Sequence, residues 1–412
     1  MYERVILWAT PAFFGLIALE VLLGWWRRRQ TYRLADAINS IALGQLSTYA
    51  GVFGRLLGFG LYLLVYGRLR LFDIDAAAPL AWLGGLVLYD FLYYWYHRLG
   101  HEVNVLWAAH VVHHQSEEFN LSTALRQTAT SYLFSGFFYL PMALLGFPPA
   151  LFLGVGLIDL LYQFWIHTEQ VGSLGWFDRV FASPSNHRVH HAVNDIYLDR
   201  NYGGILILWD RLFGSFQPEL ESEPPVYGTR DPLRSWNPVW ANLHSYAALA
   251  ADSWHARRWA DKLRVWVRHP GWRPADVAAR FPKREFRLGA LGKFRPALPR
   301  ALAAYCLLQS LVILALGTHF LAVAPGWPAW AVAAYLGWLA LSLAVVGGLM
   351  EARADYARAE FARLALSAVA VVALLRGAGT AALAGALAAV LASAAWLWLA
   401  RRAIAPAAAV AA

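Results

Sequence analysis

The sequence has a single cysteine, Cys306, and only 15% of its 412 residues are charged. A lone cysteine excludes a disulfide framework within the chain and any metal site built from thiolates, so a bound metal would need histidine or carboxylate ligands. The scarcity of charge accompanies a hydrophobic content of 59%, which is far too apolar for a soluble domain of this length. The composition therefore predicts a protein of the lipid bilayer.

The formal net charge of +9 does not indicate a nucleic-acid-binding protein. The arginines flank or separate long apolar runs, where they set the topology of a membrane protein. Aromatic residues make up 15% of the chain and many stand at the ends of apolar runs, where amphipathic rings favour the headgroup region. No nucleic acid is therefore expected among the partners.

Nine apolar runs come close to the length of about 20 residues that a spanning helix needs. Five precede the polar middle of the chain, at Val5–Trp25, Ile41–Val65, Leu80–Tyr96, Ser131–Gly146 and Ala150–Trp165. The last two are short and are joined by a Phe147-Pro148-Pro149 turn, which predicts a shallow or tilted hairpin. Four Ala- and Leu-rich runs follow, at Ala301–Val323, Trp327–Met350, Phe361–Leu375 and Ala378–Leu399.

These runs predict an all-α, polytopic membrane helical bundle with about nine transmembrane segments and a His-rich di-metal cap on the cytosolic side. Residues 1–300 are predicted to form the catalytic domain with a water-facing segment, and residues 301–412 a four-helix transmembrane extension of unknown role. The positive-inside tendency places Arg27, Arg28 and Arg29 in the cytoplasm, and alternate threading then puts His97, His110 and the polar segment there too. The first run lacks a small-residue cleavage site, so it is predicted to be a retained helix rather than a signal peptide.

Nine of the 13 histidines are gathered in four short stretches. They form an HxxxH box, two HxxHH boxes and one histidine within WIHTE, namely His97 and His101; His110, His113 and His114; His187, His190 and His191; and His167. Residues three and four apart share a helix face, so each box presents two or three imidazoles toward one point. The other four histidines are interpreted as surface or packing residues.

Imidazole is the commonest protein ligand for metals and suits iron, zinc, copper or nickel. Nine imidazoles exceed what one ion accepts, and a structural zinc needs only four ligands, so two ions are the simplest interpretation. The eight box histidines are the predicted catalytic metal ligands. His167 is the predicted ninth ligand, although a lone histidine beside a membrane helix is as often a buried hydrogen-bonding group.

A ligating imidazole usually donates its second ring N–H to a carboxylate, carbonyl or amide. Asp90 is the best candidate acceptor, because it lies seven residues before His97 on about the same helix face and would be costly in an apolar run without a partner. Further candidates for this supporting role are Glu102, Glu117, Asn120, Glu169, Asn186, Asn194 and Asn201.

At these residues the sequence resembles the fatty acid hydroxylase and sterol desaturase superfamily, and longer segments are similar to the alkylglycerol monooxygenase family within it. The similar segments are Asp90–Arg98, Phe119–Gln127, Tyr162–Glu169, His187–His191 and Trp209–Phe216. The resemblance runs from about Leu80 to Trp272. It implies a di-iron centre with the boxes as ligands, molecular oxygen, and tetrahydrobiopterin as the reductant. It also implies a lipid substrate from the bilayer, an alkylglycerol whose ether bond is cleaved through hydroxylation of the adjacent carbon.

Two other functions stay open from the residues alone. The same scaffold could hydroxylate or desaturate a sterol, a carotenoid or a fatty acyl chain, and a separate redox protein could replace the pterin. A membrane metal transporter would also bind ions through histidine clusters. Transport, however, predicts ionisable residues along several spans, and the apolar runs hold few of them.

Overall fold

The computed structural model describes residues 2–375 and 379–401, and over these ranges the chain is helical with no β-strand beyond two isolated bridges. The N-terminal half contains α1 Tyr2–Trp26, α2 Leu34–Leu69, α3 Pro79–Glu102, α4 Asn104–Ala108, α5 Val111–His114, α6 Leu121–Ala124, α7 Tyr132–Phe138, α8 Leu140–Leu145 and α9 Pro149–Trp165. Then follow α10 Pro184–His191, α11 Leu208–Leu212, α12 Pro238–His255, α13 Trp259–Val267, α14 Ala275–Arg280, α15 Arg300–Val323, α16 Ala329–Met350, α17 Ala354–Leu375 and α18 Thr380–Ala400. The prediction of an all-α membrane bundle is confirmed.

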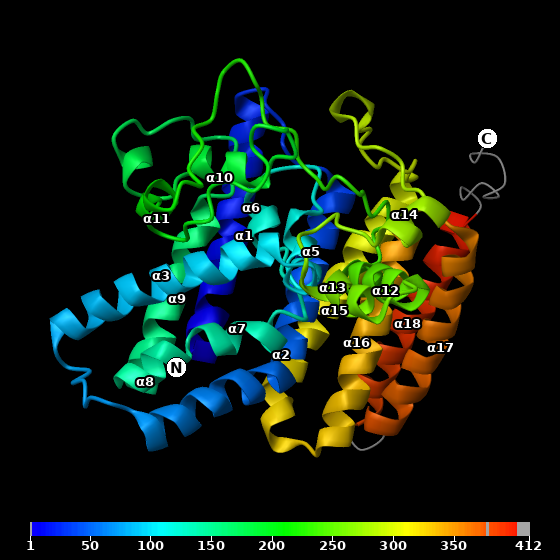
Figure 1. The fold of residues 1–412 in the computed structure, drawn as a ribbon. Coiled ribbons are helices and arrows are strands. Elements are labelled where there is room, and N and C mark those ends of the chain that lie inside the picture. Colours follow the sequence, from blue (N-terminus) through cyan, green and yellow to red (C-terminus); the bar gives the residue numbers. More distant parts are fainter. Residues whose placement is uncertain (1, 376–378, 402–412) are drawn as a thin grey trace. The chain divides into compact units, whose positions relative to one another are not determined.

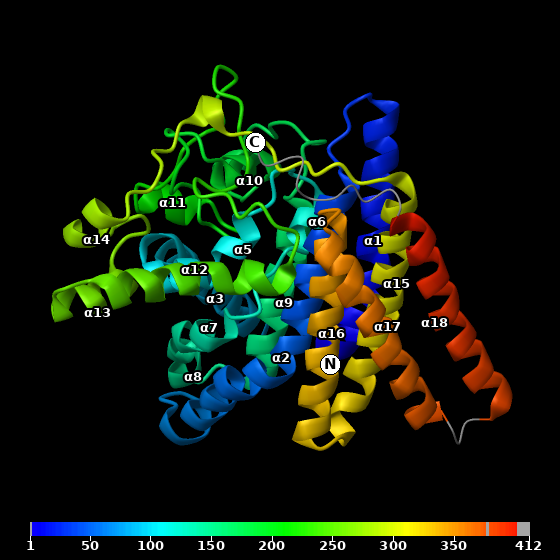
Figure 2. The same ribbon diagram turned by 90° about the vertical axis from the view of Figure 1, so that its right-hand side faces the viewer.

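The chain divides into two compact units, which Figures 1 and 2 show from two sides. The first unit runs to Leu233 and resumes at Asn242–Gly292, so it holds every histidine box. The second contains Arg234–Ala241 and the chain from Lys293 onward. The predicted domain division at residue 300 stays a prediction, because compactness alone does not show that either part folds independently.

In the first unit, α3 packs against α9, and α2 packs against α7 and α8 (Figure 1). An apolar core lies among these helices and includes Tyr62, Met142 and Leu151, all of them almost fully buried. Helix α8 ends at Gly146, whose φ of +94° is left-handed and where a Cβ atom would lie 1.8 Å from the carbonyl oxygen of Phe72. Glycine ends the helix here because it alone adopts this conformation without a steric penalty. The packing fixes the end of α3 beside the end of α9.

Three helical segments of the described chain are long and apolar enough to cross a membrane, at Arg300–Gly326, Ala329–Met350 and Thr380–Ala400. The bent pair Leu34–Gly54 and Leu57–Leu69 makes a fourth if it is one span. The predicted run from Ser131 to Gly146 is two short helices, α7 and α8, and α9 has 17 residues. Ala378, the first residue of the last predicted run, lies outside the described residues. The chain is an integral membrane protein.

In the second unit, α15, α16, α17 and α18 pack side by side in chain order, and α18 also contacts α15 (Figure 2). An ion pair is buried among them, with Arg363 donating to Glu360 at 2.6 Å and to Gln309 at 2.7 Å. The hydroxyl of Tyr305 also donates to Glu360. Burying charges in an apolar bundle is costly unless they are paired and hydrogen-bonded, and both conditions are met here.

Candidate metal centre

Four helix ends of the first unit carry the nine histidines. The last two turns of α3 present His97 and His101, and His167 lies two residues after the end of α9. The second box begins at the residue before α5 and fills that short helix, and the third box fills the end of α10. Helix α10 begins in a favourable way, because Ser183 accepts a hydrogen bond from the Asn186 N–H and a proline follows Ser183 at the first helical position. The structure thus brings all nine sequence-predicted ligands together.

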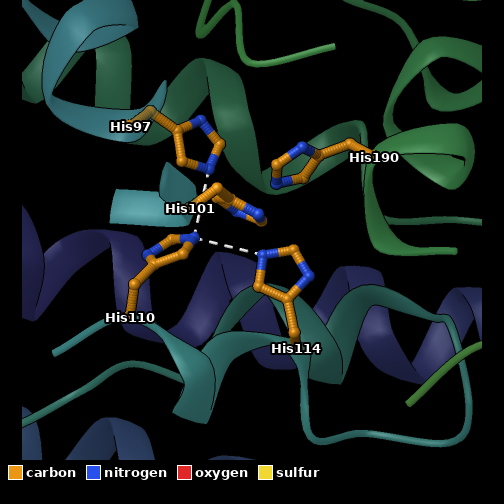
Figure 3. Close-up of side chains that lie close together, drawn as sticks. All are labelled: His97, His101, His110, His114 and His190. Carbon is orange, nitrogen blue, oxygen red and sulfur yellow. Dashed lines mark hydrogen bonds between the residues drawn. The ribbon is translucent and has the colours of Figure 1, made fainter. Parts of the chain in front are cut away.

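The histidines form two groups. In the five-histidine group the ligand nitrogens all lie within 4.8 Å of one another, and its members are His97, His101, His110, His114 and His190. Figure 3 shows these five rings facing one another, with the His110 Nε2 atom 3.1 Å from the Nε2 atoms of both His97 and His114. The five-histidine group therefore offers a ring of nitrogens to one central point.

The four-histidine group also brings its ring nitrogens close to one another. It consists of His113, His167, His187 and His191, all of them buried. The His167 Nε2 atom lies 2.9 Å from that of His187 and 3.2 Å from that of His113. His191 Nε2 lies 3.1 Å from His113 Nε2, which closes the group.

Each HxxHH box is divided between the two groups. His110 and His114 belong to the five-histidine group, while His113 belongs to the other. The third box reverses this, since His187 and His191 join the four-histidine group and His190 joins the five-histidine group. Adjacent histidines thus serve neighbouring sites, and the rings of His114 and His191, one from each group, stack with their centroids 4.4 Å apart. The sequence predicted that all the imidazoles of a box face a single point. In the structure, the imidazoles of each HxxHH box face two adjoining histidine groups.

The protonation of His113 and His167 shows why these groups suit a cation. The Nδ1 atom of His113 lies 2.9 Å from the Arg126 carbonyl oxygen, and that of His167 lies 2.7 Å from the Gln163 carbonyl oxygen. A carbonyl can only accept, so each Nδ1 carries the hydrogen and each neutral ring keeps a lone pair on Nε2. Burial lowers the pKa of His113 to about 4 and that of His167 well below its ordinary value, so both rings are neutral at pH 7. Two lone pairs then face each other at 3.2 Å.

Two further observations fit a bound metal, the first in the five-histidine group and the second in both groups. The Nε2 atoms of His101 and His190 are buried and have no hydrogen-bond partner, which is costly unless something binds them. Nitrogens about 2.1 Å from one ion are about 3.0 Å apart at a right angle and about 3.4 Å apart at the tetrahedral angle, as in imidazole–metal sites. The spacings of 2.9–3.2 Å agree with such a shell. Ligands must be unprotonated, and burial lowers the pKa of His187, His190 and His191 well below the ordinary value.

Backbone carbonyls, which the sequence did not reveal, orient four of the rings. Besides the two above, the Nδ1 atom of His97 lies 2.8 Å from the Tyr202 oxygen and that of His190 lies 3.0 Å from the Arg200 oxygen. The fifth partner is a carboxylate, because Asp199 Oδ1 lies 3.5 Å from His101 Nδ1. Asp199 has a φ of +56°, a conformation that a non-glycine residue adopts at a cost. The residues from Asp199 to Tyr202 therefore form one supporting loop for the five-histidine group.

Asp90 holds the chain just after this loop, and its hydrogen-bond partners in the described chain are not histidines. Its carboxylate accepts hydrogen bonds from the Ile205 N–H at 2.7 Å, the Leu206 N–H at 3.0 Å and the Trp209 indole N–H at 2.9 Å. A second buried carboxylate, Asp210, was missed by the sequence prediction. It accepts hydrogen bonds from the N–H groups of Tyr202 and Gly203, both at 2.7 Å, and from the Ser215 hydroxyl. Asp210 thus fixes the loop that carries the Tyr202 carbonyl, and Asp90 fixes the chain that follows it.

The other sequence-predicted supporting residues lie around the histidines but have other partners. Asn120 caps α6 and donates to the Thr31 carbonyl, and Glu169 forms a 3.6 Å ion pair with Arg29. The remaining contacts are those of Glu117 beside Gly228, Asn186 with the Asp178 and Phe181 carbonyls, Asn194 with the Val226 N–H, Asn201 with the Asn186 carbonyl, and Glu102 with Arg98. Their role in orienting ligands stays a prediction.

The chain is similar in sequence to lipid hydroxylases and monooxygenases of known families. Residues 82–215 match the fatty acid hydroxylase family model. The chain is 40% identical to human alkylglycerol monooxygenase over 267 residues, which are 65% of this chain but only 59% of the human protein. It is 36% identical to the alkylglycerol monooxygenase of Danio rerio over 365 residues, 87% of this chain and 80% of that protein. It is also 33% identical to the ornithine lipid hydroxylase OlsE of Rhizobium tropici over 133 residues, 32% of this chain and 40% of OlsE.

No solved structure matches the chain significantly. The match to the Danio rerio protein covers most of both chains. All four histidine stretches lie within residues 82–215, the part that the family model matches. The resemblance predicted from the motifs is thus confirmed: the chain belongs to the alkylglycerol monooxygenase family.

Proposed function

We propose that the protein is a membrane-bound, O₂-dependent monooxygenase that hydroxylates an ether lipid at the carbon next to the ether oxygen, so that the ether bond breaks and a fatty aldehyde is released. The observation that carries the proposal is the pair of adjoining histidine groups, whose facing, unprotonated Nε2 atoms suit two cations. Family membership supplies the substrate class, since the relatives are named as alkylglycerol monooxygenases.

We assign one iron ion to each group, with His97, His101, His110, His114 and His190 around one and His113, His167, His187 and His191 around the other. When bound, iron supplies the reactivity toward dioxygen that amino-acid side chains lack. The protein contributes the fixed orientation of the imidazoles and the exclusion of water. Carbonyls and Asp199 hold the rings, and all but one of the nine histidines are buried, with His110 partly buried.

The reductant in this proposal is a reduced pterin or a separate redox protein. Pterin use rests on the family resemblance alone. Two electrons per turnover are required from either source, because insertion of one oxygen atom of O₂ into a C–H bond reduces the other to water.

We further propose that about nine apolar segments enter the bilayer, with the metal centre at its cytoplasmic surface. The Trp25-Trp26 pair followed by three arginines at the end of α1 supports this orientation. Helices α7, α8 and α9 are short, so we place them as a shallow hairpin rather than full spans. In this arrangement the lipid reaches the metals from the bilayer, with its headgroup near the cytosolic surface and its alkyl chain between the helices that lead to His97 and His167.

The decisive experiment is lipid analysis of membranes with and without the protein, supplied with O₂ and a reduced pterin. We expect ether lipids to be consumed and fatty aldehyde to appear, and the His113→Ala variant to lose both turnover and bound metal. The exposed His255, which lies on α12 outside both groups, provides a matched His255→Ala control that should retain activity. An unchanged ether-lipid pool would refute the substrate assignment.

A second candidate keeps the same chemistry and changes the lipid. The similarity to an ornithine lipid hydroxylase over 133 residues favours hydroxylation of an acyl chain or another membrane lipid. In the same experiment, a newly hydroxylated acyl lipid or sterol beside an intact ether-lipid pool would identify this alternative.

A further inference from the structure

Helix α13 turns an apolar face away from the rest of the first unit. Trp259, Leu263 and Val267 follow one another at intervals of four residues, so they share one side of the helix. Their exposed fractions are 81%, 72% and 64%, and Trp254 in the last turn of α12 is 81% exposed. We call Trp259, Leu263 and Val267 the α13 face. A contiguous exposed surface of large apolar side chains marks a site of contact with a membrane or another protein.

The opposite side of α13 fixes this orientation. Asp261 and Val265 are buried, and the Asn104 side chain donates a hydrogen bond to the Val265 carbonyl at 2.8 Å. The Asn104 N–H donates to the Arg268 carbonyl at 2.9 Å. Since Asn104 begins α4, which lies between the first two histidine boxes, α13 is attached to the scaffold of the metal centre. A rotation of α13 that buried its apolar face would break both hydrogen bonds.

Cations border the α13 face. The segment Trp254–Arg268 has one acidic residue and five basic ones, Arg257, Arg258, Lys262, Arg264 and Arg268. An outward apolar face between basic residues is typical of a helix lying in the plane of a membrane surface. Basic residues at that depth attract anionic headgroups, and tryptophan favours the same region. The charge pattern therefore selects a lipid surface of negative charge over a neutral one.

The direction of the helix agrees with this placement. Figure 2 shows α13 running crosswise to α1, which belongs to the same unit and whose sequence from Phe13 to Leu23 is apolar except for Glu20. If α1 crosses the bilayer, α13 lies in the plane of the bilayer. The water-facing segment predicted from the sequence thus contains one stretch suited to lipid contact.

We propose that the α13 face, together with Trp254, inserts into the membrane–water interface and that the bordering arginines bind anionic phospholipid headgroups. This membrane contact is separate from the predicted spans and does not depend on the identity of the lipid substrate. It holds α4, and with it the chain between His101 and His110, next to the bilayer surface.

The test uses a spin label in the full-length protein, reconstituted in vesicles of phosphatidylcholine with or without phosphatidylserine. The label is placed by Leu263→Cys in a Cys306→Ala background, and Glu221→Cys, in an exposed loop of the same unit, is the matched control. We expect the label at 263 to collide preferentially with dioxygen, which concentrates in the bilayer, and the control label with a water-soluble nickel chelate. A label at 263 that meets the chelate as often as the control, or that is shielded from both reagents by a protein partner, would overturn the proposal.

The charge requirement is tested in the same system. We expect the label at 263 to lie deeper in the bilayer when phosphatidylserine is present. The double substitution Arg257→Gln and Arg258→Gln should remove this difference in depth. Equal depth in both lipid mixtures, with both arginines in place, would refute the binding of anionic headgroups. A photoreactive residue in place of Trp259, in a chain that keeps Cys306, gives an independent measurement. Phospholipid adducts are expected, and a crosslink only to protein, or no lipid adduct, counts against the proposal.

Discussion

Replacing Asp210 by asparagine tests whether the loop behind the proposed metal centre governs metal binding. Asp210 is fully buried, and its two carboxylate oxygens accept the Tyr202 N–H, the Gly203 N–H and the Ser215 hydroxyl. The Tyr202 carbonyl in turn accepts the Nδ1–H of His97 at 2.8 Å. Asparagine has the same shape but replaces one oxygen by an NH₂ group. In either orientation, that NH₂ group faces at least one backbone N–H that has lost its acceptor.

The expected effect on stability and metal binding follows from the one backbone N–H that loses its acceptor. One buried N–H without an acceptor costs about 1–3 kcal/mol, and the loss of the charged acceptor weakens the hydrogen bonds that remain. If the loop relaxes to relieve this cost, the Tyr202 carbonyl moves and His97 is no longer held in its ligating orientation. Changes to groups that orient ligands typically weaken metal binding or activity by about 10- to 100-fold. We therefore expect Asp210→Asn to lower metal affinity by about that factor and turnover with it.

The assay is the metal content of the purified protein after dialysis against a graded series of chelator concentrations, together with turnover at full metal loading. Asp75→Asn is the matched control, since Asp75 accepts the Ala77 N–H but is exposed, where such a change alters stability by no more than about 0.5 kcal/mol. If Asp210→Asn retains metal as tightly as the control does, the loop does not control the orientation of the His97 ring, and the reasoning fails.

Three further outcomes are expected. His187→Ala should lose more metal than His110→Ala, because the first substitution leaves three histidines in its group and the second leaves four. Elemental analysis measures the bound metal, and a larger loss in His110→Ala would contradict the assignment of the groups. Asp199→Asn should weaken metal retention by about 10-fold or more through His101, and unchanged chelator resistance would exclude that role. Acidifying the metal-free protein from about pH 6.5 to about pH 4 should destabilise it. Burial lowers the pKa of His113 to about 4 in the folded state, so protons bind more to the unfolded chain in this window, contributing up to about 1.4 kcal/mol per pH unit for each such histidine. Denaturation midpoints that rise on acidification would contradict this.

The sequence by itself determined the class of protein and the histidines that gather in the candidate metal centre. Apolar runs and scarce charge specify a membrane bundle, because the length of a spanning helix is set by the bilayer. The three- and four-residue spacing of the boxes brings imidazoles onto one side of a helix, because the helix repeats every 3.6 residues. The eight box histidines selected in this way lie in the two groups, and so does His167, which has no such spacing. The longer motifs also identified the family.

Only the tertiary structure decided how those histidines are divided between the two groups and how their rings are oriented. Helical spacing does not determine that His113 and His114 serve different groups, because this depends on which helix ends lie on either side of α5. Nor does it reveal that most ring partners are carbonyls, such as that of Tyr202, 105 residues from His97, since every residue has a carbonyl and none has a sequence signature for this role. Asp90 was predicted to accept a hydrogen bond from His97, but in the structure it accepts the N–H groups of Ile205 and Leu206, more than 100 residues away. Local spacing follows from helix geometry, whereas the choice of long-range partners follows from the packing of the whole unit.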